Sequence, residues 1–70
     1  MQSKLIVLRK ETGTTQHELA GLLGISIRAY SFKETGKTEF KINEMFKIAQ
    51  YFNKSIEDVF IPHILQNGVK

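Results

Sequence analysis

Cysteine and tryptophan are absent from this chain of 70 residues, and proline occurs once, at Pro62. Without cysteine, the fold has no disulfide and no thiolate–zinc site to supplement its core. The longest apolar runs, such as residues 5–8 (LIVL), are too short for a membrane span or for the hydrophobic part of a secretory signal. We therefore expect a cytoplasmic protein with no membrane partner, no metal and no other cofactor.

A strong excess of charge of either sign is also lacking. Ten Lys+Arg and seven Asp+Glu leave a net charge of +3, and the pI is about 9.4. This modest basic excess is compatible with a nucleic acid or an acidic surface as partner but does not establish one. The length allows one small domain. We expect it to occupy residues 1–70, with a core at about 4–60 and a tail at 61–70.

Glycines divide the chain into short helical segments. Gly13, Gly24 and Gly36 each follow a segment with helical spacing of apolar residues, and glycine after a helix is a common stop signal. No stretch alternates apolar and polar residues in the manner of a strand. The sequence therefore predicts an all-α fold of five short helices, at residues 4–12, 15–23, 27–34, 42–52 and 55–60.

Capping residues precede most of these segments. Thr15 and Glu18 have the spacing of a capping box, in which each side chain binds the backbone N–H of the other residue. Ser55 and Asp58 are expected to form a second capping box, and the other expected caps are Ser3 and Ser26. Lys41 is a poor cap for the fourth helix, although that helix has the clearest apolar stripe, formed by Met45, Ile48, Ala49 and Phe52.

Residues 15–26 contain a capped helix, a glycine turn and a second cap within a short span. A turn of three or four residues makes two helices cross steeply. Ala20 is small where the helices must approach each other, Gly24 can adopt a positive φ, and Ile25 can plug the turn. The pattern predicts a helix-turn-helix over about residues 15–35.

The sequence resembles the phage repressor/Cro (XRE-type) family of helix-turn-helix transcriptional regulators. The matching runs are residues 8–11 (LRKE), 15–20 (TQHELA), 23–26 (LGIS), 34–37 (ETGK), 48–49 (IA) and 55–60 (SIEDVF). The resemblance implies a lambda-repressor-like domain whose third helix enters the major groove of duplex DNA. It also implies a phage or bacterial regulator, most simply a repressor, that occupies an operator as a homodimer.

By position, the resemblance directs four side chains of the third helix toward the base pairs: Ile27, Arg28, Ser31 and Phe32. Arg28 can bind guanine through two hydrogen bonds, or it can hold a phosphate. Ser31 suits a base or a phosphate, whereas Ile27 and Phe32 suit thymine methyl groups. Phe32 can instead pack in the core or face a protein partner. Tyr30 stands where the family is usually aliphatic, and we expect it in the core with its hydroxyl at the rim.

The resemblance implies phosphate contacts from Gln16, Lys37, Thr38 and Lys41. The resemblance also implies that Gln16 braces the third helix. Gln16 lies at a helix N-terminus, whose free N–H groups suit an anion, but it can also be a plain first-turn residue. The loop that contains the lysines can equally be a solvated loop. Arg9 and Glu34 are expected to form a structural brace between the first and third helices.

Two positions besides Lys41 depart from the family pattern. Lys33 stands where many members have an inward-packing Trp, Tyr or Leu, and Phe32 is bulky where polar side chains are common. A slightly rotated third helix would explain both departures. The set of base contacts is therefore open to change.

The end of the chain is rich in apolar residues, which suggests a dimer surface formed by Val59, Phe60, Ile61, Ile64 and Leu65. The same residues can instead pack within the chain against the first helix. An enzyme is not expected, because His17 and His63 are far apart in the sequence and no catalytic or phosphate-loop motif is present. No small-molecule substrate is expected either. The alternative function is a helix-turn-helix scaffold that binds another protein, such as an antitoxin, anti-repressor or adaptor.

Overall fold

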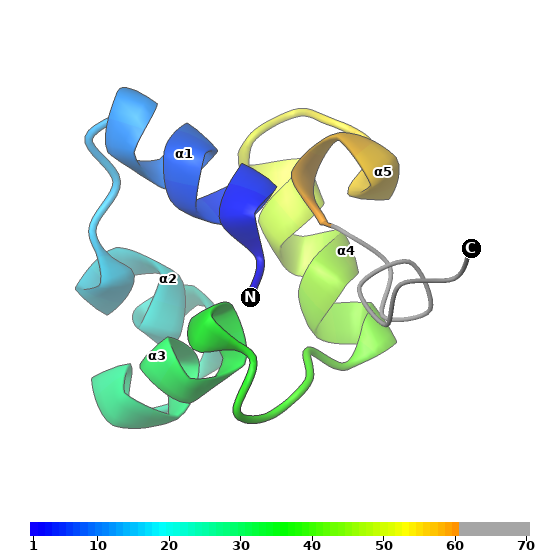
Figure 1. Ribbon diagram of the computed structural model, residues 1–70. Helices are drawn as coiled ribbons and strands as arrows, with labels where there is room; N and C mark the ends of the chain where they lie inside the picture. Colours follow the sequence, from blue (N-terminus) through cyan, green and yellow to red (C-terminus); the bar gives the residue numbers. More distant parts are fainter. Residues whose placement is uncertain (61–70) are drawn as a thin grey trace.

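The computed structural model describes residues 1–60 and has five α-helices in this part of the chain (Figure 1). The helices are α1 (Ser3–Glu11), α2 (Gln16–Leu23), α3 (Ile27–Thr35), α4 (Ile42–Tyr51) and α5 (Ile56–Val59). No strand occurs in residues 1–60. The prediction of an all-α fold of five short helices is confirmed, and no helix end differs from its predicted position by more than one residue.

Hydrogen bonds from side chains define the starts of three helices. The capping box at α2 is present: Glu18 N–H donates to Thr15 Oγ1 at 3.1 Å, and Thr15 N–H donates to Glu18 Oε1 at 2.8 Å. Ser26 accepts from Ala29 N–H at 3.0 Å and begins α3. Ser55 accepts from Asp58 N–H at the start of α5, which confirms the Ser55 half of the predicted second capping box. The predicted cap at Ser3 is wrong, because Ser3 is the first residue of α1 and Gln2 precedes it without a capping side chain.

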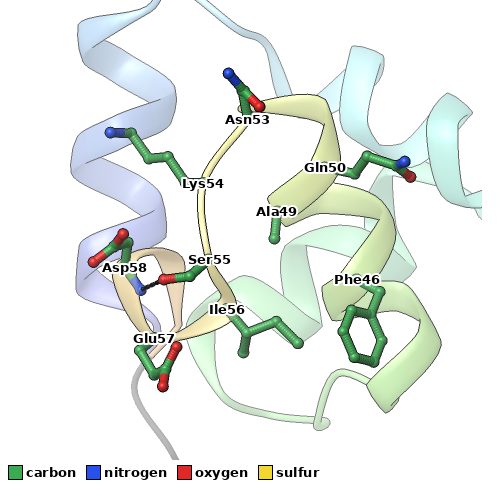
Figure 2. Close-up of a pocket in the computed structure, with 9 residues that line it drawn as sticks. All are labelled: Phe46, Ala49, Gln50, Asn53, Lys54, Ser55, Ile56, Glu57 and Asp58. Atoms are coloured by element: carbon green, nitrogen blue, oxygen red, sulfur yellow. Dashed lines mark hydrogen bonds between the residues drawn. The ribbon is translucent and has the colours of Figure 1, made fainter.

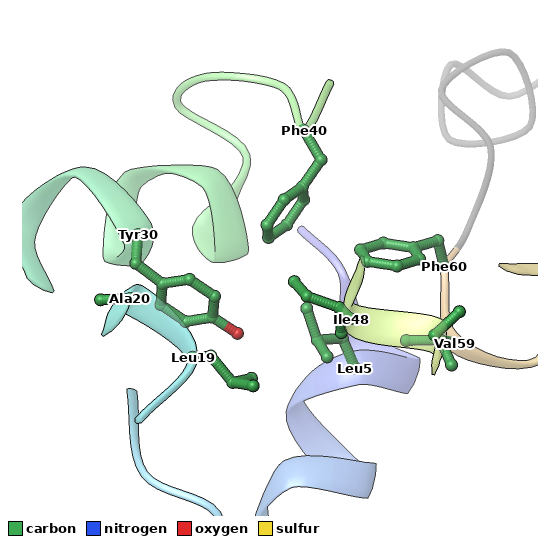
Figure 3. Packing of buried hydrophobic residues seen from close by; sticks show 9 residues of the cluster. Leu5, Leu19, Ala20, Tyr30, Phe40, Ile48, Val59 and Phe60 are labelled. Carbon is green, nitrogen blue, oxygen red and sulfur yellow. The ribbon is translucent and has the colours of Figure 1, made fainter. Parts of the chain in front are cut away.

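The helices pack around one core that includes residues from all five. Its buried apolar residues are Leu5, Leu19, Ala20, Tyr30, Phe40, Ile48, Ala49, Val59 and Phe60. The ring of Phe40 lies edge-on between those of Tyr30 and Phe60, with centroid separations of 5.9 Å and 5.1 Å (Figure 3). Such edge-to-face pairs stabilise a core beyond the area that they bury. This aromatic row connects α3 with the end of α5.

The end of α5 corrects one expectation from the sequence. Val59 and Phe60 are 0% and 2% exposed within a single chain, so they are not available as a dimer surface. The alternative of packing within the chain holds for these two residues, because α5 contacts both α1 and α4. The other three expected dimer residues, Ile61, Ile64 and Leu65, lie outside the described residues.

Hydropathy and helix length give one further result for residues 1–60. None of their helices combines the length and the apolar character needed to cross a membrane. The longest of them, α4, has 10 residues.

Candidate functional site

A tight turn joins α2 to α3 and determines how the two helices cross. Gly24 has φ of 70°, a left-handed conformation that strains residues with a Cβ atom. The Ile25 N–H donates to the Ala20 carbonyl at 3.0 Å, which closes the end of α2. Ala20 is 2% exposed where α2 packs on the core, and Ile25 packs partly against that core. The roles predicted for these three residues are confirmed.

The two faces of α3 have different surroundings. Tyr30 and Glu34, one turn apart, are 0% and 2% exposed and point into the molecule. On the other side, Ile27 is 46% exposed and Arg28 is exposed, whereas Ser31 and Phe32 are half-buried. The structure therefore brings the four predicted base-contact residues together on the face of α3 that the core does not cover.

A buried carboxylate, Glu34, holds α3 against α1 and α2. Its Oε2 accepts from Arg9 Nε and from the Tyr30 hydroxyl, each at 2.8 Å. Its Oε1 accepts from Arg9 Nη2 at 3.1 Å and from Gln16 Nε2 at 2.8 Å. A carboxylate has about four lone-pair positions, and these four hydrogen bonds use them. The predicted brace between Arg9 and Glu34 is present as a two-pronged ion pair.

Ionisation in this cluster follows from burial and hydrogen bonding. Burial alone raises the pKa of Glu34. The hydrogen bonds from Arg9, Gln16 and Tyr30 outweigh this effect, and the pKa of the carboxyl lies below its usual value. Burial, and next the hydrogen bond to Glu34, raise the pKa of the Tyr30 hydroxyl, which therefore keeps its proton and donates it. The cluster is thus an ionised carboxylate surrounded by donors at neutral pH.

One member of the cluster, Tyr30, differs from its predicted role, whereas Gln16 braces α3 as predicted. Tyr30 is in the core as expected, but its hydroxyl does not lie at the rim and is bound to Glu34 inside the molecule. Gln16, at the first position of α2, is half-buried and donates to Glu34. That hydrogen bond ties the start of α2 to α3.

A polar loop follows α3 and contains the other predicted phosphate contacts. Lys37, Thr38 and Lys41 are all exposed. The loop leaves the helix at Gly36, which has φ of 93°. The N–H groups of Lys37 and Thr38 both donate to the Phe32 carbonyl, at 2.9 Å and 3.2 Å. These bonds hold the first part of the loop beside the exposed face of α3.

The aromatic ring of Phe32 lies between two cations on this face. The Arg28 guanidinium carbon is 5.5 Å from the ring centroid, and Lys37 Nζ is 5.1 Å from it. Both separations are within the range of cation–π attraction. Arg28, Phe32 and Lys37 thus form a cluster, which we call the α3 cation–aromatic cluster.

A link between α3 and α4 was missed by sequence reasoning. Lys33 Nζ lies 3.1 Å from Glu44 Oε1, and the same oxygen accepts from Lys41 N–H at 2.8 Å. Glu44 therefore accepts the backbone N–H of Lys41 at the start of α4, where the Lys41 side chain makes no capping hydrogen bond. The signal was a glutamate three residues after the cap position, as in other capping boxes. The Lys33 side chain extends toward α4 and pairs with Glu44 there, which is the structural reason for its departure from the family pattern.

A shallow groove lies between α4 and α5 (Figure 2). It is lined by Phe46, Ala49, Gln50, Asn53, Lys54, Ser55, Ile56, Glu57 and Asp58. Ser55 provides the one hydroxyl group among these lining residues, and this group accepts the N–H of Asp58 as a helix cap. No histidine or cysteine is among them. Within residues 1–60, no group of three His, Cys, Asp or Glu side chains is placed to hold a metal ion.

Comparison with known proteins identifies similar chains. A family model described as helix-turn-helix matches residues 5–59. An HTH-type transcriptional regulator of Archaeoglobus fulgidus is 38% identical over 61 residues, which are 87% of this chain and 87% of that protein. Another from Methanocaldococcus jannaschii is 39% identical over 61 residues, 87% of this chain and 92% of that protein.

A solved structure supports the same relationship at the level of the fold. The crystal structure of a transcriptional regulator from Listeria innocua matches this structure with a TM-score of 0.77 and 27% sequence identity. The match covers 93% of this chain and 65% of that one, so the chain spans about two thirds of the Listeria protein.

Proposed function

Because the chain belongs to the helix-turn-helix family, whose model matches its residues 5–59, we propose that it is a sequence-specific regulator of transcription that binds duplex DNA. It acts in the cytoplasm as a phage or bacterial repressor by occupying an operator. The observation that carries this proposal is the orientation of α3. Glu34 is held inward by Arg9, Gln16 and Tyr30, which leaves the opposite face of the helix uncovered.

Base reading is proposed for the four residues of that uncovered face. Arg28 donates two hydrogen bonds to guanine O6 and N7, which is worth about 1–3 kcal/mol of discrimination. Ile27 and Phe32 contact thymine methyl groups, and Ser31 binds a base edge or a phosphate. The mixture of one long cation, one hydroxyl and two apolar side chains suits a half-site that contains both guanine and thymine.

Phosphate binding is proposed for residues on both sides of α3. Lys37, Thr38 and Lys41 are exposed in the loop after it, and Gln16 lies at the start of α2 with the free N–H groups of that helix. Each phosphate neutralised by a lysine contributes about 0.9 to the salt slope of binding. These contacts fix the position of the protein on the duplex without choosing its sequence.

A homodimer is proposed, because one helix-turn-helix contacts one half-site and dimers read two half-sites about 34–36 Å apart. With Val59 and Phe60 in the core, we propose that the second copy docks on α4. Ile42 and Phe46, one turn apart on this helix, are 62% and 61% exposed. The predicted dimer residues Ile61, Ile64 and Leu65 lie outside the described residues, and their contact with the second copy stays a prediction.

The dimer surface is tested by sedimentation of Phe46→Lys against Lys47→Phe, which changes the neighbouring exposed residue in the opposite sense. Phe46→Lys is expected to sediment as a monomer that keeps its helical content and binds a single half-site. A dimer of unchanged stability in Phe46→Lys would contradict this surface.

The regulator function is tested by selecting binding sites for the pure protein from random duplex DNA at two salt concentrations. The expected result is an enriched inverted repeat whose half-sites lie one helical turn apart. Weak binding that is lost at moderate salt, with no enriched sequence, would refute the proposal. That result would favour a helix-turn-helix scaffold that binds another protein.

Two variants separate base contacts from phosphate contacts on the selected site. Arg28→Ala is expected to bind with relaxed sequence preference, whereas Lys37→Ala weakens binding to every sequence alike and lowers the salt slope by about 0.9. Lys54→Ala is the matched control, since Lys54 is exposed in the turn between α4 and α5, far from α3 (Figure 1). Equal loss of affinity for all sequences in Arg28→Ala would make Arg28 a phosphate contact.

A further inference from the structure

Phe32 occupies an unusual position on the exposed face of α3. It is half-buried, but the inward-facing aromatic position of the helix is already taken by Tyr30, which is 0% exposed. The ring instead contacts two side chains that point away from the core, the guanidinium of Arg28 and the ammonium of Lys37. Phe32 is thus neither a core residue nor an isolated apolar residue on the surface.

Both the backbone carbonyl and the aromatic ring of Phe32 help to position the two cations. Its carbonyl accepts the N–H groups of Lys37 and Thr38, which fixes the backbone of the loop against the last turns of α3. Its ring lies 5.1 Å from Lys37 Nζ and 5.5 Å from Arg28 Cζ. One residue therefore positions a cation from the helix and a cation from the loop.

The charge of this cluster is unbalanced. Within residues 1–60, neither Arg28 nor Lys37 makes an ion pair with an acidic side chain. Two like charges near the same ring repel each other, and the negative face of the ring offsets this only in part. An anionic partner on the exposed side relieves the repulsion, and the DNA backbone is such a partner.

We propose that Phe32 is a specificity-determining residue that aligns Arg28 with a guanine while Lys37 holds a neighbouring phosphate. The inference rests on the proposed function and deepens it by naming the sequence class of the half-site. Arg28 and Phe32 are one helical turn apart, about 6 Å along the axis, and base pairs are stacked about 3.4 Å apart. The cluster therefore reads a guanine and a thymine about two base-pair steps apart, and the methyl group of the thymine contacts the exposed part of the Phe32 ring.

The principal test measures how strongly the protein distinguishes guanine from adenine at the Arg28 position of the selected site. Phe32→Leu keeps an apolar side chain but removes the π-face, and Phe32→Tyr keeps both. Wild type and Phe32→Tyr are expected to prefer guanine by about tenfold or more. In Phe32→Leu this preference is expected to fall to about threefold or less, with the salt slope unchanged because both cations remain.

The thymine contact is tested by replacing this thymine with deoxyuridine, which removes only the methyl group. Wild-type binding is expected to weaken about threefold, whereas a Phe32→Ser variant is expected to bind the two duplexes equally. Equal binding of both duplexes by the wild type would overturn this part of the proposal.

Controls distinguish positioning from a general loss of structure. Thermal unfolding of each variant is followed by circular dichroism, and Tyr51→Leu is the matched change at an exposed aromatic residue of α4 to which no DNA or dimer contact is assigned. An unchanged guanine preference in a folded Phe32→Leu would overturn this inference and leave the regulator function intact. A wild type without any enriched sequence would overturn both.

Discussion

Replacing Arg9 by leucine tests whether the buried Glu34 cluster holds the recognition helix in place. The change removes both prongs of the ion pair, at 2.8 Å and 3.1 Å, and also the hydrogen bond from Arg9 Nη1 to the Thr14 carbonyl at 3.2 Å. Glu34 stays buried in the variant, with donors left only from Gln16 and Tyr30. The carboxylate therefore keeps its burial but loses its counter-charge.

The size of the effect follows from burial. Removing one partner of a buried ion pair costs about 3–5 kcal/mol. The Arg9 side chain is 13% exposed, so water screens the pair slightly, and two donors remain, which reduces the expected loss to about 2–3 kcal/mol. A domain of this length has a free energy of unfolding of roughly 3.5–10 kcal/mol. With a urea m-value of about 1 kcal/mol/M, the unfolding midpoint is expected to fall by about 2–3 M.

The pH dependence identifies the cause of the loss. In the wild type the folded-state pKa of Glu34 is lowered, so its stabilising contribution is present above the unfolded pKa of about 4.3 and is lost as pH falls through the folded pKa. In Arg9→Leu, burial dominates and raises the folded pKa of Glu34. Protonation then favours folding, and the variant gains stability as pH falls toward 4. The difference between the two proteins should narrow from pH 7 to pH 4.

The assay is urea denaturation followed by circular dichroism at pH 7, 5.5 and 4. Lys47→Leu is the control, because Lys47 is exposed on α4 and its loss is expected to change stability by about 0.5 kcal/mol or less. A stability difference between wild type and Arg9→Leu that stays constant with pH would refute the reasoning. It would mean that lost packing of the long side chain, and not the unpaired carboxylate, causes the destabilisation.

Three further substitutions test other parts of the fold. Thr15→Ala removes the capping box with Glu18 and is expected to lower stability by about 1 kcal/mol in thermal unfolding, whereas Thr15→Ser keeps most of it. Gly24→Ala is expected to cost about 1–2 kcal/mol by urea denaturation, and since a Cβ there meets no atom within 4 Å, the cost arises from the backbone at φ of 70° alone. Tyr30→Phe removes one hydrogen bond to the Glu34 carboxylate and is expected to cost about 1.5–3 kcal/mol in the same assay; an unchanged midpoint would show that this hydroxyl contributes little.

Local signals in the sequence account for the helices and their limits. The capping pair Thr15–Glu18, the cap Ser26 and the glycines with positive φ act on their nearest neighbours along the chain, so their effect can be read without the fold. The apolar stripe of α4 is also a local signal, and Ile48 at its centre is fully buried. For the same reason, the family resemblance was visible from residues alone.

The tertiary structure decided which of the predicted functional residues meet and which are buried. Glu34 is 25 residues from Arg9 and 18 from Gln16, and only helix packing brings the three together with the Tyr30 hydroxyl. Lys33 and Glu44 likewise form an ion pair only because the loop between α3 and α4 brings the two helices together.

At the end of α5 and on the exposed face of α3, the surroundings of a side chain likewise depend on residues that are distant in the sequence. The composition of residues 59–65 indicated apolar surface, but whether Val59 and Phe60 face a partner or the core depends on α1 and α4, which pack on them. Phe32 was open to three interpretations in the sequence. The structure excludes the core, because the ring lies beside Arg28 and Lys37 and outside the core cluster, while its contact with DNA stays a prediction. Helix starts and turns are determined by a few neighbouring residues, whereas burial and charge pairing depend on groups that only the folded chain brings within a few ångströms.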